Sequence, residues 1–122
     1  MDRKIKLTVN GTAFQAVLQD NALAENIAEM CPFSADFTRS GGHEYYAALP
    51  GKASVNGCTS TTSAHRNRLY YFEGWNAFSI VFKDCSTAPY QIYHVGDFDE
   101  ELSALLEKSG GSVHILCENE EH

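Results

Sequence analysis

Apolar and polar residues alternate along much of this chain, most clearly over residues 69–83, which read LYYFEGWNAFSIVFK. Phe78, Ile80 and Phe82 occupy every second position, and this period places side chains on one face of a β-strand. Residues 73–76 interrupt the run with turn-forming chemistry. We therefore expect two paired strands here, with the three apolar side chains in the core, where burying each one contributes roughly 1.5–3 kcal/mol.

The first quarter of the chain predicts a hairpin followed by a helix. Residues 5–19 alternate on either side of Asn10-Gly11, and Asn-Gly between alternating runs is the strongest short signal for a two-residue hairpin turn. Apolar residues then recur at i, i+4 and i+7, which predicts a short helix with one apolar stripe. Asp20 or Asn21 can cap its start, and Pro32 ends it because the residue before proline disfavours helical dihedrals.

Shorter periodic segments predict the remaining elements. Further strands are expected over residues 33–38, 44–49, 90–95 and 113–117. Gly96 is expected to break the sheet, and Asp99 to cap a second short helix that ends at Gly110. Residues 52–68 are rich in Ser, Thr, Asn and Gly, and they predict a long loop of the kind that is usually functional or mobile.

Together these elements predict a mainly β fold. About seven or eight strands and two short helices in 122 residues indicate a closed antiparallel barrel with helices over its ends, because closure removes exposed sheet edges. A chain of this length forms one domain. We expect that domain to span residues 1–118, followed by an acidic tail over residues 119–122.

Charge and hydropathy exclude several classes of partner. The formal net charge is −7 and the chain has nine Lys and Arg residues, so it lacks the positive charge on which affinity for nucleic acid mainly depends. No apolar run approaches the roughly 18 residues of a membrane-spanning helix. Residues 1–8 contain no continuous apolar segment of the kind a signal peptide has. We expect a cytoplasmic protein that binds neither nucleic acid nor membranes.

The cysteines and histidines do not form a metal-binding pattern. The four cysteines are widely spaced without a C-x-x-C pair, and the five histidines lack H-x-H or H-E-x-x-H spacing. We therefore expect reduced thiols, no metal site and no cofactor. Cys58 in a polar loop and Cys85 in a predicted turn are the two candidates for an exposed, reactive thiol.

Several segments, taken in their order and spacing, resemble the bacterial cyclophilin-like domain family. They are residues 5–14 (IKLTVNGTAF), Cys31-Pro32, residues 42–46 (GHEYY) with Leu49-Pro50, residues 76–82 (NAFSIVF) and residues 90–96 (YQIYHVG). The resemblance extends over nearly the whole chain. It implies an eight-stranded barrel with two short helices, the fold shared with peptidyl-prolyl isomerases, and it agrees with the strand count obtained from periodicity.

The number of Tyr and Trp residues suggests a binding site. One small core cannot bury so many of these side chains with every hydroxyl satisfied, so some must reach a surface. They could form ordinary cross-strand pairs on the barrel exterior. Alternatively, a subset lines a concave site for a small molecule or peptide. The candidate ligand-binding residues are Phe37, Arg39, Glu44, Tyr46, Trp75 and Phe78.

We therefore interpret the chain as a binding module for a small molecule or peptide without assigned catalysis. One alternative is a weak peptidyl-prolyl isomerase, in which Arg39 or the arginine of His65-Arg66 would act on the substrate carbonyl. The chain lacks the Phe-His-Arg and Gln-Gly-Gly segments of true cyclophilins, since Ala64 precedes His65. The other alternative is an interaction domain or homodimer that uses an exposed aromatic face. A pocket containing Tyr, Trp and Arg39 would favour binding or isomerisation, and a flat aromatic face would favour the interaction domain.

Overall fold

The first hairpin forms as its sequence predicts. In the computed structural model, which describes residues 3–120, β1 (Arg3–Val9) pairs with β2 (Thr12–Leu18) around Asn10-Gly11. The two turn residues have φ of 51° and 82°, the positive values that a type I′ turn requires.

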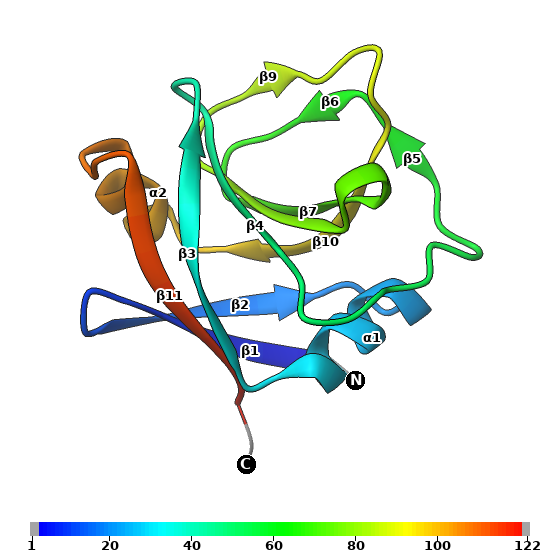
Figure 1. The fold of residues 1–122 in the computed structure, drawn as a ribbon, viewed down its shortest axis with the longest axis horizontal. Coiled ribbons are helices and arrows are strands. Elements are labelled where there is room, and N and C mark those ends of the chain that lie inside the picture. Colours follow the sequence, from blue (N-terminus) through cyan, green and yellow to red (C-terminus); the bar gives the residue numbers. More distant parts are fainter. Residues whose placement is uncertain (1–2, 121–122) are drawn as a thin grey trace.

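The long strands close into a barrel, shown in Figure 1. Besides the first hairpin, they are β3 (Phe33–Ser40), β4 (Glu44–Ala48), β7 (Arg68–Phe72), β8 (Ala77–Val81), β10 (Ile92–Phe98) and β11 (Ser112–Asn119). Their order around the barrel is β2-β1-β11-β3-β4-β8-β7-β10, and β10 pairs back onto β2. All these pairings are antiparallel. The predicted closed eight-stranded barrel is confirmed.

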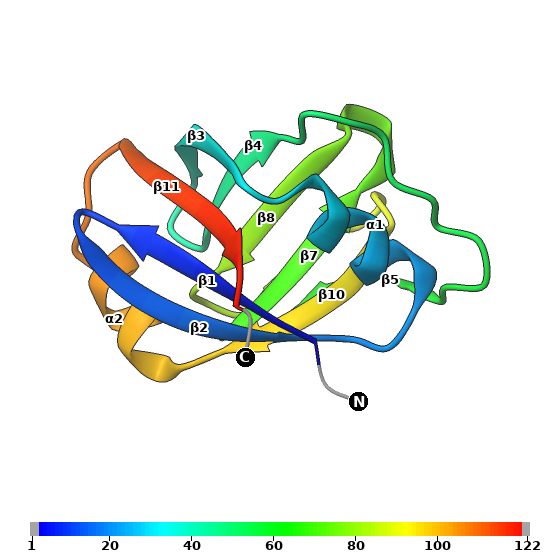
Figure 2. The ribbon, with the colours of Figure 1, turned by 90° about the horizontal axis from the view of Figure 1, so that it is seen from below.

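Two helices lie at opposite ends of this barrel (Figure 2). Of the two predicted caps of α1 (Ala22–Met30), Asn21 is the one used, and its side chain accepts a hydrogen bond from the Ala24 amide at 2.8 Å. Asp99 precedes α2 (Glu100–Glu107), but its side chain makes no capping hydrogen bond. This helix ends before Gly110, the predicted stop. Within residues 3–120, no helix has the length and apolar character needed to cross a membrane.

The core fills the inside of the barrel. Phe78, Ile80 and Phe82 are fully buried there, as their alternation predicts. Leu102 and Leu106 of α2 are buried in the same cluster, as are Leu23 and Ile27 of α1. Both helices therefore close the barrel by contributing their apolar stripes to one continuous core.

Gly96 does not break the sheet, so that prediction was wrong. Strand β10 continues through it to Phe98, with a register shift between His94 and Gly96 where it pairs with β7. A Cβ atom at Gly96 would lie 2.6 Å from the carbonyl oxygen of Val17. The glycine therefore allows β2 to approach β10 closely and complete the barrel.

Part of the predicted loop, and the first residue of the predicted tail, belong to strands. Residues 52–68 contain β5 (Ser60–Thr61) and β6 (Ser63–Ala64); β5 pairs with β10, and β6 pairs with β9 (Cys85–Ser86) in a separate ribbon. Asn119, the first residue of the expected acidic tail, belongs to β11 and donates a 2.8 Å hydrogen bond to the Ala28 carbonyl. Residues 121–122 of that tail, and residues 1–2 of the expected domain, lie outside the described residues.

The four thiols have different environments, which predicts an order of reactivity. Burial raises the pKa of Cys31 to about 11, and burial also raises the pKa of Cys117 and of Cys85. Cys58 is half-buried in the segment before β5. Because the thiolate is the reactive form, iodoacetamide at about pH 8 should alkylate Cys58 first and leave Cys31 and Cys117 unmodified. Peptide mass spectrometry of the native protein measures this order, and early labelling of Cys117 would contradict it.

The raised pKa of the Cys31 thiol makes the free energy of unfolding depend on pH. The fold favours the protonated thiol of Cys31, so its folded pKa lies above its unfolded pKa. This contribution to the free energy of unfolding is complete below an ordinary thiol pKa of about 8.5, and it is lost as the pH rises through about 11.

Candidate functional site

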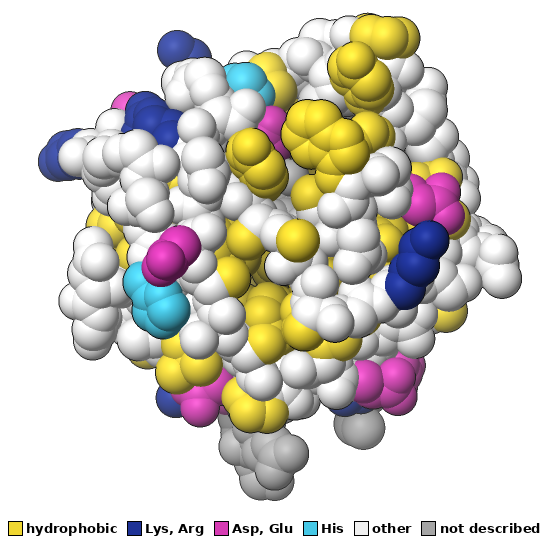
Figure 3. Space-filling view, in the orientation of Figure 1, with side chains coloured by type: hydrophobic (Ala, Val, Ile, Leu, Met, Phe, Trp, Pro, Cys, Tyr) yellow, Lys and Arg dark blue, Asp and Glu magenta, His cyan; other side chains and the backbone are white. Residues whose placement is uncertain are grey.

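A pocket of about 440 Å³ lies against the outer face of the barrel. Its floor is formed by outward-facing residues of β4, β7 and β8, and its other walls come from the β6–β9 ribbon, the turn after β9 and the 3₁₀ turn η1 (Glu73–Trp75). In the space-filling view, hydrophobic side chains gather on the upper part of this face beside an acidic and a histidine side chain (Figure 3).

Strand alternation explains how the same strands serve both core and pocket. Tyr45 points into the barrel, whereas Glu44 and Tyr46 on either side of it line the pocket. On β8, Phe78 and Ile80 face inward, while the residues between and beside them face the pocket. All five residues of β8 are buried, because the core covers one face and the pocket walls shield the other.

Four aromatic residues, which we call the aromatic rim, border the pocket: Tyr46, Phe72, Trp75 and Tyr90. Adjacent ring centroids are 6.2 Å apart for Tyr46 and Trp75, 5.6 Å for Phe72 and Trp75, and 5.8 Å for Phe72 and Tyr90. Trp75 is 68% exposed and Tyr90 is 62% exposed, and they are the exposed large hydrophobic residues in the described part of the chain. The rim therefore presents ring surface to solvent at the mouth of a concavity.

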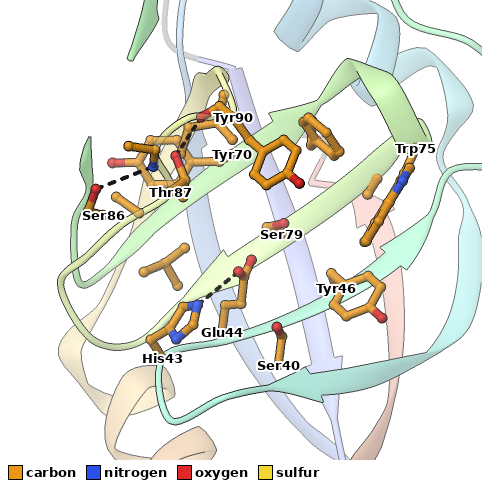
Figure 4. Close-up of a pocket in the computed structure, with 16 residues that line it drawn as sticks. Ser40, His43, Glu44, Tyr46, Tyr70, Trp75, Ser79, Ser86, Thr87 and Tyr90 are labelled. Carbon is orange, nitrogen blue, oxygen red and sulfur yellow. Dashed lines mark hydrogen bonds and ion pairs between the residues drawn. The ribbon is translucent and has the colours of Figure 1, made fainter. Parts of the chain in front are cut away.

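The polar groups of the pocket centre on Glu44. Its carboxylate points into the pocket, as Figure 4 shows, and its Oε2 lies 3.1 Å from Nε2 of His43. The side chain of Glu44 is 19% exposed. Ser40, Ser79 and Thr87 add hydroxyl groups. No lysine or arginine is among the described residues that line the pocket.

Hydrogen bonds fix the walls around these groups. The Tyr70 hydroxyl, at the floor, accepts a 3.0 Å hydrogen bond from the backbone amide of His65, next to β6. The Thr87 hydroxyl donates to the Tyr90 carbonyl at 2.8 Å, and the amide of Thr87 donates to the Thr62 carbonyl at 2.7 Å. These bonds hold the turn that carries Tyr90 against the ribbon.

Three of the six predicted site residues line the pocket, namely Glu44, Tyr46 and Trp75. Phe37 and Phe78 lie inside the barrel instead, fully buried and with ring centroids 6.2 Å apart. Since a ligand in the pocket cannot reach them, we remove both from the candidate site. The alternation of Phe78 with Ile80 and Phe82 already predicts the core for Phe78, so an aromatic ring is not by itself a sign of a site residue.

Arg39, the remaining predicted site residue, holds the C-terminal end of α2. Its Nη1 lies 2.9 Å from the carbonyl oxygen of Leu106, 3.0 Å from that of Ser109 and 3.1 Å from the Tyr45 hydroxyl. Its guanidinium carbon is 4.7 Å from the centroid of the Phe82 ring. A cation among helix C-terminal carbonyls is favourable, so the contacts of Arg39 account for its position without a ligand.

Arg66 also contacts α2, and it does not line the pocket. It forms ion pairs with Glu100 and Glu107, and its Nη1 donates a 2.6 Å hydrogen bond to the Phe82 carbonyl. The hydrogen bond from Arg66 lowers the pKa of the Glu100 carboxyl. Neither arginine that could have acted in isomerisation therefore lies in the pocket.

Sequence reasoning missed several residues of the pocket. Phe72 and Tyr90 belong to the aromatic rim, and His43 contacts Glu44. Tyr90 was predicted to begin a strand over residues 90–95, but β10 begins at Ile92 and Tyr90 lies in the turn after β9. Nothing in the sequence could have placed it near β4, because the β6–β9 pairing involves two residues on each strand and leaves no periodic signal.

A closed eight-stranded antiparallel barrel with a helix at each end is the fold of a cyclophilin-like protein. The model of the Cyclophilin-like family matches residues 7–118, and the chain therefore belongs to that family. This confirms the family resemblance seen in the sequence.

The fold also resembles a solved structure. The solution structure of a hypothetical protein from Archaeoglobus fulgidus matches with a TM-score of 0.70 and 11% sequence identity, over 98% of this chain and 95% of that chain. At this identity the likeness concerns the fold alone. No curated protein sequence matches the chain significantly.

Proposed function

We propose that this protein is a binding module that takes a small molecule or a short peptide into the pocket on the outer face of the barrel. The observation that carries the proposal is the placement of Trp75 and Tyr90, whose exposed rings stand at a concave site and not on a convex surface. The volume of about 440 Å³ lies within the range of roughly 300–1,000 Å³ typical of ligand pockets.

The two alternative functions have less support. Isomerisation would require a guanidinium near the substrate, and both Arg39 and Arg66 are engaged at α2. An interaction domain would place its aromatic residues on a flat face, whereas the aromatic rim borders a hollow. The pocket does offer aromatic walls with a few convergent polar groups, the usual composition of a small-molecule site.

Trp75→Ala should reduce the affinity of pocket ligands by about tenfold or more, because the exposed indole supplies contact area at the mouth of the pocket. Ligands are first identified by a screen of small molecules and X-Pro peptides, using amide chemical shifts of pocket residues. The loss for Trp75→Ala is then measured by calorimetry. Since Trp75 is largely exposed, the free energy of unfolding should change by less than about 0.5 kcal/mol.

Phe14→Ala serves as the control, because it truncates an aromatic residue of β2 that does not line the pocket. It should leave affinity unchanged. The binding proposal fails if no compound shifts the pocket resonances. Concentration-dependent dimerisation that Trp75→Ala abolishes would instead support an interaction face.

A further inference from the structure

We infer that the pocket binds a small organic cation, specifically an alkylated ammonium group, between the Glu44 carboxylate and the aromatic rim. This inference rests on the proposed function, because it names the chemical class of ligand for the same pocket. Three observations support it: the isolation of Glu44 from other cations, the arrangement of the aromatic rings, and the composition of the walls.

Glu44 is the least exposed carboxylate that forms an ion-pair contact in the described residues. Its side chain is 19% exposed, against 37–77% for the other carboxylates in such contacts. Glu100 and Glu107 have the guanidinium of Arg66, and Glu118 has Lys6. Glu44 contacts His43, which carries no charge when neutral.

A partly desolvated carboxylate is stabilised by a nearby positive charge. In the described part of the chain, Oε1 of Glu44 makes no hydrogen bond, while Oε2 is held by His43 at 3.1 Å. The imidazole therefore orients the carboxylate and leaves one oxygen directed to the pocket (Figure 4). No lysine or arginine is among the described lining residues, so while His43 is neutral a cationic ligand can supply the charge complementary to Glu44.

The aromatic rim provides ring faces that can bind such a cation. Aromatic ring faces attract cations, and groups of Trp, Tyr and Phe rings are a recurrent means of binding quaternary ammonium ligands. Tyr46, Phe72, Trp75 and Tyr90 form a connected series with neighbouring centroids 5.6–6.2 Å apart. Figure 4 shows the Glu44 carboxylate between the labelled rim residues Tyr46 and Trp75 on one side and the turn that carries Tyr90 on the other.

The remaining walls select for alkyl substitution of the ammonium group. Ala64, Ala77, Val81, Ala88 and Ile92 present methyl and methylene surface. A primary ammonium group needs three acceptors to replace its water, whereas an alkylated one is weakly hydrated and gains from apolar contact. An anion would meet a carboxylate with no positively charged side chain to offset it.

The test compares choline with dimethylbutanol, its neutral isostere in which carbon replaces the quaternary nitrogen. Trp75 is the only tryptophan of the chain, so its fluorescence reports on the pocket directly. Titrations are run at about pH 8, where an ordinary histidine is neutral. We expect choline to bind at least about tenfold more tightly than dimethylbutanol.

Two matched variants isolate the charge. Glu44→Gln keeps the shape of the side chain and should weaken choline binding by about tenfold while leaving dimethylbutanol within about twofold of wild type. Asp36→Asn removes a carboxylate from a similar pair, in which Asp36 lies 2.8 Å from His114 on an exposed part of β3 outside the pocket. It should bind both probes as wild type does. Retained binding of dimethylbutanol shows that the Glu44→Gln pocket is intact.

The cation inference is overturned if choline and dimethylbutanol bind equally, if Glu44→Gln binds choline like wild type, or if choline fails to bind while other compounds of the screen do. In each of these cases the pocket still binds ligands, so the proposed function stands. Failure of every compound in the screen would remove both proposals together.

Discussion

Gly96→Ala is expected to lower the free energy of unfolding by about 3 kcal/mol, which corresponds to roughly 10 °C in Tm. The added Cβ would lie 2.6 Å from the Val17 carbonyl oxygen and 3.2 Å from the Leu18 Cα. Both contacts are with backbone atoms, which cannot rotate away as a side chain could. Strand β2 would have to move off β10, and this pairing is the one that closes the barrel.

Thermal unfolding followed by circular dichroism measures this effect. Gly111→Ala is the matched control, because apart from its chain neighbours nothing lies within 4 Å of its Cβ position, and its backbone lies outside the left-handed region. That variant should unfold within about 2 °C of wild type. If Gly96→Ala were equally stable, the close approach of the two strands would not be needed for closure.

Arg39→Ala should destabilise the protein by about 3–4 kcal/mol without weakening ligand binding in the pocket. The guanidinium donates to the Leu106 and Ser109 carbonyls, and hydrogen bonds from charged groups contribute roughly 1.5–3 kcal/mol each. Stacking over Phe82 adds about 0.5–2 kcal/mol. These contributions share one side chain and are not additive, so the total lies below their sum.

Urea unfolding gives the stability change, and titration below the transition gives the affinity. Arg3→Ala provides the comparison, since its ion pair with Glu25 is exposed at the surface and should contribute less than about 1 kcal/mol. If Arg39→Ala kept wild-type stability but lost ligand affinity, Arg39 would be a ligand-binding residue, as the sequence predicts.

The barrel could be predicted because its signals are local and periodic. Inward-facing residues recur at every second position on the barrel strands. Asn10-Gly11 occupy turn positions that require positive φ, and Asn21 occupies a helix cap that requires a side-chain acceptor, and few other residues meet these requirements. The prediction that Gly96 breaks the sheet was wrong because a glycine in an alternating pattern also fits the end of a strand. Its actual role depends on β2, which lies about eighty residues earlier in the chain and which no local pattern connects to it.

The candidate site could be predicted only in part because it depends on which face of each strand points outward. Glu44, Tyr46 and Trp75, three of the residues predicted to bind a ligand, line the pocket. Phe37 and Phe78 are equally aromatic, yet they point into the barrel, and composition cannot distinguish the two faces. The alternation of Phe78 with Ile80 on β8 does predict the core for Phe78, and its aromatic ring alone had suggested the site.

The β6–β9 ribbon has a consequence for how the family can diversify. It is held together by two residue pairs, whereas β1 and β2 pair over seven residues, and it lies outside the closed ring of strands. Substitutions or insertions in this ribbon reshape one wall of the pocket while leaving the barrel contacts in place. If the proposed function holds, a change in this ribbon would alter which ligand the pocket takes while the ring of eight strands keeps its pairing.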